Sequence, residues 1–418
     1  MFRPTFAVVD APAIRANVAA VRSLLQSDKR LLVAVKADGY GHGAAAAAEA
    51  ALAGGATDLG VASVEEAVAL READVTAPIL VLGVSSAVGV RAAAEFGVTV
   101  TVGRIEEVDE LDKIPWPTTS VTPTSAGAEG PGRTLRAKVH LKIDTGMSRL
   151  GVRSAADAVL LAKRIVASER LELAGVFTHL ACADASSLAH AQAQIERFQE
   201  ALSALRKAGI DPGIVHAANS AAALRRPDWH FDMVRVGIAA YGYGPAGVFD
   251  SPVPLLPALH LYSCVTRVAT LQAGDTVGYG ATFTAPREMR VATLPVGYAD
   301  GYFRILSNRA SVLFHGRRAP VVGNVCMDQL MVDVTELPEV TVGDCATLYG
   351  RSAPESWTAE RLSAAAENDL SVFVGPFFLA ENSASVLSLD ELADLAGTIS
   401  YELMCALSPR VPRVVLSL

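Results

Sequence analysis

A lysine at the end of an apolar run is the first residue whose type and position point to chemistry. Lys36 closes the run LLVAVK and is followed by the turn GYGHG at residues 39–43. A lysine between a buried strand and a dense turn is partly desolvated, which lowers its pKa and favours the neutral amine that attacks carbonyl groups. The simpler alternative is a lysine that ends a strand in solvent, and Lys36 alone does not exclude it.

Polar side chains also follow later apolar runs. The segment HLKIDTGMSRLG crowds Lys142, Asp144 and Arg149 together, although an ordinary solvated charge cluster would have the same composition. The segment GVFTHL supplies His179, and a single histidine after an apolar strand is usually structural. Arg235 lies in a further apolar run, VRVGI. These positions predict a polar site wherever the ends of the runs meet.

One later segment suggests an anion site. In HAANSAA, Asn219 and Ser220 open a predicted helix, and Ser220 fits a cap at its first turn. The free backbone N–H groups of a helix N-terminus attract phosphate. Gly237 and Ile238 would offer further amides to the same phosphate.

The elements that must position these residues alternate along the first half of the chain. From residue 11 to 241, apolar runs alternate with helix-like segments such as 12–26, 64–71 and 191–208. Continuous apolar runs are typical of buried parallel strands. About eight strand–helix repeats favour a (β/α)8 barrel, whose active face is formed by the carboxyl ends of the strands. A doubly wound open sheet is the competing fold, but no G-x-G-x-x-G follows the first strand. The expected strands are 31–36, 58–62, 78–83, 97–102, 137–144, 173–179, 213–217 and 232–237.

The sequence pattern changes after residue 241. Gly and Pro become frequent, and closely spaced strand-like runs follow without long helices between them. This pattern predicts a mostly-β domain over residues 242–418, which the N-terminal strand in residues 1–10 joins. Two stretches look like insertions: residues 117–134, read as a flexible surface loop, and residues 373–397, with a short helix around 389–395.

Composition excludes several classes of function. The chain has 51% hydrophobic residues, a net charge of −8 and 5 scattered cysteines without a C-x-x-C pair. The acidic balance argues against nucleic-acid binding, and the cysteines indicate neither a disulfide framework nor a metal site. No signal peptide or membrane span is indicated, since the Ala-rich stretch around residues 44–53 is too short. We therefore expect a soluble, cytoplasmic protein.

The segment LLVAVKADGYGHG resembles the cofactor-attachment segment of the alanine racemases, and the resemblance extends over nearly the whole chain. It implies that Lys36 carries pyridoxal 5'-phosphate and that Tyr40 contacts the cofactor's phosphate. It also implies that Arg149 steadies the cofactor's phenolic oxygen and the substrate carboxylate. Lys142 is similar to a lysine that many members carbamylate, which turns a cation into an anion that orients Arg149.

By the same resemblance, Arg235 faces the pyridine nitrogen of the cofactor. Arginine is not deprotonated in proteins, so it only donates hydrogen bonds and the ring nitrogen stays unprotonated. The ring is then a weaker electron sink, which suppresses transamination while permitting proton exchange. Val236 stands where many members have proline.

Racemisation requires bases on opposite faces of the α-carbon. Lys36 serves one face. The segment TVGYGATF supplies Tyr279, whose position between glycines suits an exposed tip, although most such tyrosines are turn residues. The resemblance implies that Tyr279 comes from the partner subunit of a homodimer with shared active sites. His179 then links Arg235 to Tyr279.

The remaining resemblances lie in the second half of the chain. Tyr401 is implied to contact the phosphate and to narrow the pocket against Tyr279, which suits alanine as substrate. The segment VGNVCMDQL supplies Met327 and Asp328, at the substrate carboxylate. The corridor through which substrate enters is implied to be lined by Tyr298, Asp300 and Arg304. The implied product, D-alanine, feeds peptidoglycan synthesis.

Three alternatives stay open on sequence alone. A small cofactor-binding barrel protein shares the lysine but ends after the barrel, whereas this chain continues. A decarboxylase of basic amino acids requires an acidic residue at the ring nitrogen, whereas Arg235 is basic. A racemase of broader specificity, with some activity on serine, is not excluded.

Overall fold

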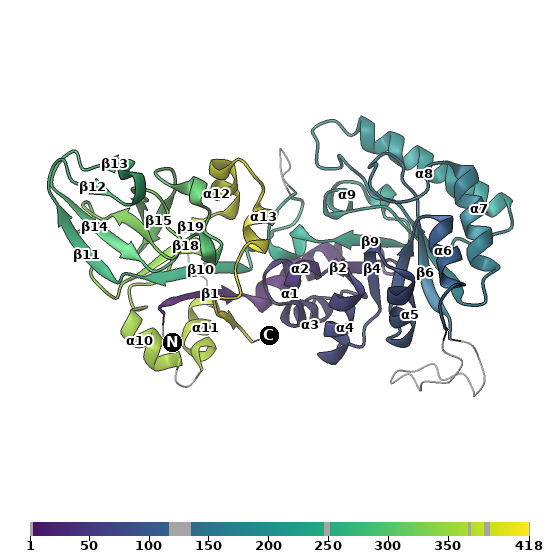
Figure 1. Ribbon diagram of the computed structural model, residues 1–418, viewed down its shortest axis with the longest axis horizontal. Coiled ribbons are helices and arrows are strands. Elements are labelled where there is room, and N and C mark those ends of the chain that lie inside the picture. The colour runs from purple at the N-terminus through teal and green to yellow at the C-terminus, as the bar shows by residue number, and fades with distance from the viewer. Residues whose placement is uncertain (1–2, 117–134, 246–250, 367–368, 380–384, 418) are drawn as a thin grey trace. The chain divides into compact units, whose positions relative to one another are not determined.

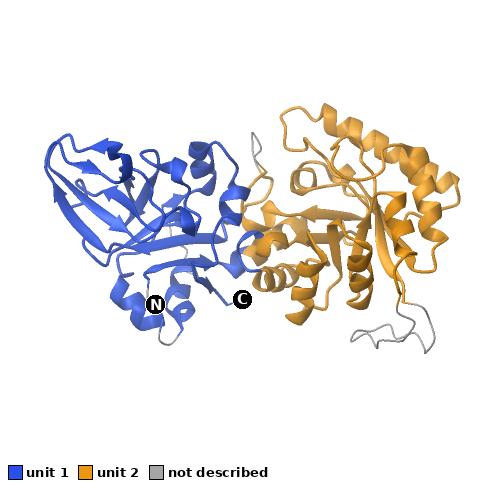
Figure 2. Cartoon of the chain, viewed as in Figure 1, with its two compact units in different colours: residues 1–13, 40–43, 257–418 blue, residues 14–39, 44–256 orange. Residues whose placement is uncertain are grey.

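The structure is a computed structural model that describes residues 3–116, 135–245, 251–366, 369–379 and 385–417. The chain forms two compact units (Figure 2). The barrel unit comprises residues 14–39 and 44–256, and the β unit comprises residues 1–13, 40–43 and 257–418. The predicted fold class, a (β/α)8 barrel with a mostly-β C-terminal part, is confirmed. The predicted loop at residues 117–134 lies outside the described residues.

Eight parallel strands close the barrel in sequence order, and β9 returns to pair with β2 through Leu32 and Arg235. The strands are buried over most of their length. Helices cover their outer face (Figure 1). This explains why their sequences read as continuous apolar runs. The strands are β2 (Arg30–Ala34), β3 (Asp58–Val61), β4 (Ile79–Val84), β5 (Thr99–Val102), β6 (Ala137–Lys142), β7 (Leu171–Phe177), β8 (Ile214–His216) and β9 (Met233–Val236).

Several helices around the barrel begin at a side-chain cap, as in α4, α5 and α7, where a serine oxygen accepts a backbone N–H of the first turn. The helices expected at 64–71 and 191–208 correspond to α4 and α8, and that at 12–26 to the shorter α1. Within the described residues, no helix combines the length and apolar character that a membrane span requires. The helices are α1 (Ala11–Ser23), α3 (Ala44–Ala53), α4 (Val64–Glu72), α5 (Ala87–Glu95), α6 (Ile105–Leu111), α7 (Ala155–Val166), α8 (Ala189–Lys207) and α9 (Ser220–Arg225).

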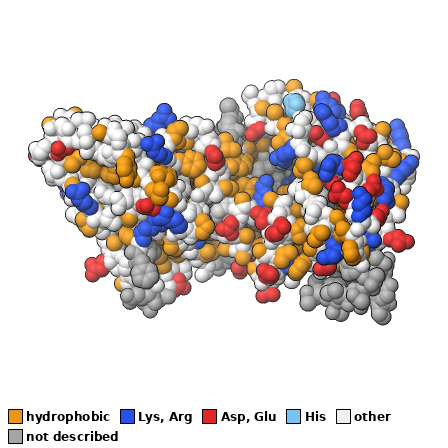
Figure 3. Space-filling model, in the orientation of Figure 1, with side chains coloured by type: hydrophobic (Ala, Val, Ile, Leu, Met, Phe, Trp, Pro, Cys, Tyr) orange, Lys and Arg blue, Asp and Glu red, His pale blue; other side chains and the backbone are white. Residues whose placement is uncertain are grey.

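The charged side chains of the barrel unit are mixed over its surface. On the face that Figure 3 shows, lysines and arginines lie among aspartates and glutamates, and no stripe of one sign crosses this unit. The exposed ion pairs Arg164–Asp109 and Arg164–Asp112, at 2.9 and 2.7 Å, are examples.

The β unit is built on a seven-stranded sheet in the order β16-β15-β18-β10-β1-β20, with β19 beside β18. The N-terminal strand β1 runs antiparallel to β10 and parallel to β20. A three-stranded sheet, β11-β14-β17, and the hairpin β12-β13 complete it. The strands are β1 (Thr5–Val9), β10 (Leu259–Cys264), β11 (Arg267–Leu271), β12 (Thr276–Val277), β13 (Phe283–Thr284), β14 (Met289–Leu294), β15 (Ser311–Phe314), β16 (Arg317–Pro320), β17 (Leu330–Asp333), β18 (Cys345–Arg351), β19 (Val386–Leu387) and β20 (Arg413–Val415).

Short helices cover part of this sheet. The helices α10 (Ala359–Ala366) and α11 (Leu370–Leu379) pack against a core that includes Phe6, Tyr262 and Trp357. The helix α10 contributes Leu362, and α11 contributes three phenylalanines. Two more, α12 (Leu389–Ala396) and α13 (Ser400–Cys405), follow. The helix predicted around residues 389–395 is therefore present as α12, whereas the start of the stretch 373–397 belongs to α11.

A buried carboxylate ties the N-terminal segment to the β unit. The side chain of Asp300 is 0% exposed, and Arg3 donates to both of its oxygens, at 3.0 and 2.7 Å. The Gly297 amide donates to one oxygen at 3.0 Å, and Arg410 Nε lies 3.6 Å from the other. A buried carboxylate is stable only when its charge is matched in this way.

Replacing Arg3 with alanine should therefore leave the carboxylate of Asp300 poorly compensated. We expect the free energy of unfolding to fall by about 3 kcal/mol in a urea titration. The matched control is Arg287→Ala, which removes an exposed pair with Glu336 in the same unit and should change little. Equal effects of the two substitutions would contradict this role of Asp300.

Candidate active site

The carboxyl ends of the barrel strands gather the polar residues that the sequence singled out. Lys142 is the last residue of β6, His179 follows β7 by two residues, and Arg235 lies near the end of β9. Lys36 follows β2, and Ser220 begins the helix after β8. Because the eight strands are parallel, all of these residues lie at one mouth of the barrel.

The centre of this mouth is the guanidinium of Arg235, which is 6% exposed. Its Nη1 donates to His216 Nδ1 at 2.9 Å, and the two hydrogens of its Nη2 are shared among Thr178 O, Ala217 O and His179 Nδ1, at 2.9, 3.1 and 3.2 Å. These four acceptors, two carbonyls and two imidazoles, are neutral. A guanidinium has five N–H donors, and these bonds leave Nε–H and one Nη1–H for a further acceptor.

The hydrogen bonds of Arg235 dictate the protonation of two buried histidines. Because Arg235 donates to Nδ1 of His216, that ring is neutral and carries its proton on Nε2. His216 Nε2 lies 2.8 Å from His140 Nδ1, so His140 accepts this proton and carries its own on Nε2. A cationic ring at either position would place two N–H groups against each other. The His140 ring fits because β7 has a glycine beside it: a Cβ on Gly175 would lie 2.7 Å from His140 Nε2.

Burial and charge act in the same direction as this geometry. Desolvation, and then the charges of Arg30 and Arg235, lower the pKa of His140 to about 3. Burial and the Arg235 charge hold the pKa values of His216 and His179 well below the usual range. His179 is therefore also neutral, and since Nδ1 accepts from Arg235, its Nε2 carries the proton.

Arg235 itself keeps its charge. Burial, with a contribution from the positive Arg149, lowers the pKa of Arg235 to about 9. This value still lies above neutral pH, so the barrel holds a cation in contact with neutral acceptors.

Lys142 is an unusual lysine. It is 4% exposed, its Nζ lies 4.8 Å from the centre of the Phe177 ring, and it reaches Ile143 O at 3.4 Å. Burial and the charges of Arg235 and Arg149 hold its pKa well below the ordinary lysine value. The side chain is thus a candidate for a neutral, nucleophilic amine at ordinary pH.

The expected crowding of Lys142, Asp144 and Arg149 is only partly found. The carboxylate of Asp144 accepts the amides of Gly146 and Ser148, at 3.0 and 2.9 Å, and lies 3.9 Å from Arg153. Asp144 therefore organises its own loop, because two backbone amides donate to it and the positive charge of Arg153 lies nearby.

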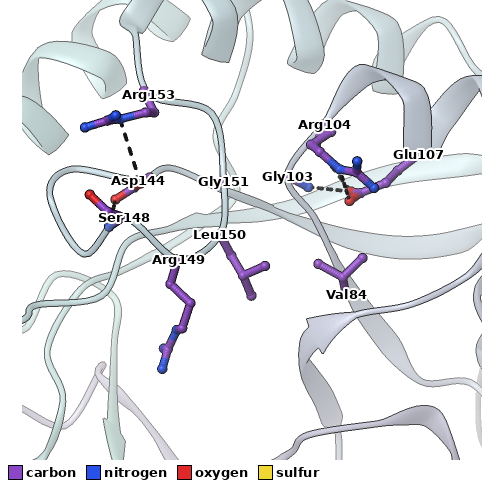
Figure 4. Close-up of a pocket in the computed structure, with 10 residues that line it drawn as sticks. All are labelled: Val84, Gly103, Arg104, Glu107, Asp144, Ser148, Arg149, Leu150, Gly151 and Arg153. Carbon is purple, nitrogen blue, oxygen red and sulfur yellow. Dashed lines mark hydrogen bonds and ion pairs between the residues drawn. The ribbon is translucent and has the colours of Figure 1, made fainter.

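Arg149 points away from Asp144 and Arg153 (Figure 4). It lines an open pocket of about 520 Å³ at the ends of β4 to β6, together with Arg104, Glu107 and Leu150. Glu107 is already engaged there, since it accepts from Arg104 Nε at 3.0 Å and from the Gly103 amide at 2.8 Å. In the described part of the chain, no ion pair or hydrogen bond occupies the Arg149 guanidinium, so the pocket presents it to a ligand.

The segment after β8 differs from its prediction in one detail. The cap of α9 is Asn219, whose side chain accepts from the Ala222 amide at 3.1 Å, and Ser220 is the first helical residue. Asn219 takes the cap because its side-chain oxygen reaches the N–H of the helix's third residue. The hydroxyl of Ser220 accepts the Gly237 amide at 2.9 Å, and Ile238 begins the 3-10 helix η2 (Ile238–Tyr241). The structure therefore brings Ser220, Gly237 and Ile238 together.

The backbone after Lys36 is left-handed. In α2 (Lys36–Tyr40), the φ angles of Ala37, Asp38 and Gly39 are 52°, 52° and 61°, and that of Tyr40 is 55°. This conformation costs roughly 1–2 kcal/mol for each residue other than glycine. Its hydrogen bonds offset the cost: Gly39 N donates to Val35 O at 2.9 Å, and Ala44 N donates to Asp38 Oδ1 at 2.9 Å. Such strain clusters at functional sites.

The β unit carries the other predicted residues. Tyr40 and Tyr401 lie together, with ring centres 6.1 Å apart, and burial, Tyr401 and Cys405 raise the pKa of Tyr40. Tyr279 begins the 3-10 helix η3 (Tyr279–Ala281) and is 75% exposed, as its position between glycines predicted. Its carbonyl accepts from Asn324 Nδ2 at 2.7 Å.

The residues expected near substrate in the β unit divide into two groups. Tyr298, Arg304 and Met327 are exposed, and Asp328 lies 2.6 Å from Arg410. Asp300, in contrast, is fully buried against Arg3, and its place beside the corridor stays a prediction.

Three residues of the barrel mouth were not predicted from the sequence. His140 and His216 lie inside apolar runs, where a lone histidine carries no signal. Glu66 accepts the backbone amides of both Ala37 and Ala62, at 2.8 and 2.7 Å. The pattern Ser-x-x-Glu at residues 63–66, a capping-box signature, could have drawn attention to Glu66.

Comparison with known proteins identifies the relatives of the chain. The family models "Alanine racemase, N-terminal domain" and "Alanine racemase, C-terminal domain" match residues 9–245 and 258–371. An alanine racemase of Symbiobacterium thermophilum is 44% identical over 98% of this chain and 97% of its own. The crystal structure of alanine racemase from Bacillus anthracis with bound L-Ala-P has a TM-score of 0.83, 36% identity, and coverage of 100% and 96% of the two chains. The biosynthetic alanine racemase of Pseudomonas aeruginosa gives a TM-score of 0.77 at 32% identity, covering 99% of this chain and 100% of its own.

The neutral His140 predicts an acid-sensitive barrel. Below pH 6.5 the unfolded chain protonates this histidine, whereas the folded chain does not until about pH 3, so stability falls as pH falls through that window. Between pH 7 and 5, His140 should account for a loss of about 2 kcal/mol in the free energy of unfolding.

The variant His140→Asn, whose Oδ1 still accepts from His216, should show a correspondingly smaller loss in urea titrations at pH 7, 6 and 5. The control His190→Asn changes an exposed histidine and should keep the wild-type pH dependence. An unchanged pH dependence in His140→Asn would contradict a neutral, buried His140.

Proposed function

The chain belongs to the alanine racemase family, and we propose that it interconverts L- and D-alanine with pyridoxal 5'-phosphate, using Lys36 and Tyr279 of the partner subunit as its two bases. The observation that carries this proposal is the donor set of Arg235. A buried cation that contacts neutral acceptors and has N–H groups to spare fits an unprotonated ring nitrogen.

The residues of the barrel mouth fit the cofactor. When bound, the cofactor supplies an electron-withdrawing ring that stabilises negative charge at the α-carbon of the amino acid. Lys36, at the end of β2, would hold it covalently. Ser220, Gly237 and Ile238 would hold its phosphate, as would Tyr40 and Tyr401, which lie together in the β unit.

Arg235 would set the reaction type. It keeps its protons, so it donates to the ring nitrogen and does not protonate it. By leaving that nitrogen unprotonated, Arg235 would keep the electron withdrawal by the ring weak, which would favour return of the proton to the α-carbon over loss of the amino group. The neutral His216 and His140 support this role of Arg235. His216 accepts from Arg235 and donates to His140, so these hydrogen bonds hold the guanidinium in one orientation.

Tyr279 would act on the face opposite to Lys36. A free tyrosine has a pKa of about 10, so it requires help to accept a proton near neutral pH. His179 offers that help, because its Nδ1 accepts from Arg235 and its Nε2–H is left to donate to the phenolate oxygen of the partner's Tyr279. The exposure of Tyr279 in one chain is what a residue that serves the partner requires.

Substrate recognition would fall to Arg149 and to the loop of Met327 and Asp328, which are proposed to contact the carboxylate of alanine. Tyr279 and Tyr401 would limit the side chain to a methyl group. Tyr298 and Arg304 would line the corridor to the site. The product, D-alanine, would supply peptidoglycan synthesis. The protein would act as a homodimer with shared sites.

Lys142 would be modified by carbon dioxide. Its neutral amine forms an N–C bond to the carbon of CO₂ and releases one proton, which converts a buried amine into a carbamate anion. This anion would match the positive charges of Arg235 and Arg149, which, after burial, lower the pKa of Lys142.

NMR of protein equilibrated with ¹³C-labelled bicarbonate should therefore show a carbamate resonance that disappears in Lys142→Ala. A wild-type spectrum without that resonance, under conditions where the protein is folded, would contradict the modification of Lys142.

The two-base assignment is tested by mixing subunits. Lys36→Ala and Tyr279→Phe homodimers should each lose at least about a hundredfold in racemisation rate, measured by circular dichroism of L-alanine. A heterodimer of the two variants, isolated by two affinity tags, has one site with both changes and one with neither. It should regain about half of the wild-type rate per dimer.

A heterodimer as inactive as its parents would show that Tyr279 does not serve the partner's site. Serine, assayed in parallel, separates an alanine-specific enzyme from a racemase of broader specificity.

A further inference from the structure

We propose that Glu66 is a positioning residue for Lys36: its carboxylate holds the left-handed turn that begins directly after this lysine. The proposal rests on the proposed function of Lys36 and deepens it. It concerns residues of the barrel unit only, namely the ends of β2 and β3 and the first turn of α4.

A single carboxylate joins the ends of two strands. Glu66 Oε1 accepts the Ala37 amide at 2.8 Å, and Glu66 Oε2 accepts the Ala62 amide at 2.7 Å. Ala37 and Ala62 lie just beyond β2 and β3, which are paired up to Ala34 and Gly60. The last backbone bond between the two segments is Val35 N to Gly60 O, at 2.8 Å. The carboxylate thus continues the connection past the point where the strands separate.

The contact falls on a strained residue. Ala37 has a φ of 52°, a conformation that alanine rarely adopts, and it is covalently next to Lys36. Farther along the turn, Asp38 Oδ1 accepts the Ala44 amide at 2.9 Å. Glu66 holds the near end of the turn and Asp38 the far end. Because the path of the chain after Lys36 fixes where that lysine points, release of the near end would let Lys36 turn away from the barrel mouth.

Glu66 does not act as an ordinary helix cap. It occupies the third position of α4, where a capping-box glutamate normally accepts the backbone N–H of the cap residue. Ser63 makes one of the two contacts of a capping box, since its Oγ accepts the Glu66 amide at 3.4 Å. The Glu66 side chain instead reaches one residue farther back, to Ala62, and across to Ala37. This choice of partners indicates that its function lies at the strand ends.

The test uses Glu66→Gln. A glutamine oxygen accepts one of the two amides, and its NH₂ group faces the other, so one contact is lost. The control is Glu65→Gln, an exposed neighbour in the same first turn. The rescue variant is Glu66→Gln with Ala37→Gly, because glycine adopts the left-handed conformation without the steric cost. Ala37→Gly alone completes the cycle.

Two readouts separate positioning from structural loss. The first is hydrogen–deuterium exchange of the backbone at residues 35–44 in protein without cofactor, which should accelerate in Glu66→Gln alone. The second is kcat for racemisation of the loaded enzyme, which should fall about tenfold, the effect of releasing roughly one strained residue, with little change in KM. The glycine substitution should restore most of kcat in the double variant, and Glu65→Gln should match wild type in both readouts.

Wild-type exchange and kcat in Glu66→Gln would overturn the proposal. A loss of kcat that Ala37→Gly does not restore, or that Glu65→Gln reproduces, would also overturn it, because the effect would then be general destabilisation of α4. If the wild-type protein did not racemise alanine, the proposed function would fail, while the exchange data would still show whether Glu66 holds the turn.

Discussion

The site depends on one constraint, the burial of a permanent cation inside the barrel mouth. Because the guanidinium of Arg235 keeps its charge at neutral pH, its buried N–H groups require hydrogen-bond acceptors. The carbonyls of Thr178 and Ala217 and the Nδ1 atoms of His179 and His216 meet this demand. Through these bonds one arginine fixes the tautomer of His216, which in turn fixes that of His140.

The same constraint explains why nearby groups lose their ordinary charge. Lys142 and the three histidines lie near Arg235, and burial together with positive neighbours lowers the pKa of each. The barrel mouth therefore contains neutral nitrogen bases around a fixed positive charge. Such a site favours an anionic modification of Lys142 and electron-rich ligands, and it disfavours a second cation.

The fold and the positions of the functional residues were largely predictable. Continuous apolar runs predicted the parallel barrel, because strands that are covered on both faces have no polar side. Lys36, Lys142, His179 and Arg235 follow or end such runs, so the topology alone brings them to one mouth. The exposed position of Tyr279 followed from the glycines on each side of it.

What escaped prediction depends on contacts between distant segments. His140 and His216 are 76 residues apart and acquire meaning only when β6 and β8 flank β7. The burial of Asp300 depends on its pairing with Arg3, 297 residues away. The left-handed turn after Lys36 includes Ala37, a residue type that rarely adopts positive φ, and a glutamate from α4 holds it. The capping-box pattern marks Glu66 as a helix start, but it does not predict that the side chain contacts Ala37.

The central claim is that Arg235 donates to a ring nitrogen that carries no proton. NMR of the protein loaded with pyridoxal 5'-phosphate labelled with ¹⁵N in the ring tests this most directly. We predict the ¹⁵N chemical shift of a pyridine nitrogen that is hydrogen-bonded but not protonated. This chemical shift should change when Arg235 is replaced by lysine. The shift of a protonated pyridinium in the wild-type protein would contradict the account, because a guanidinium that keeps its protons would then face a ring with a proton of its own.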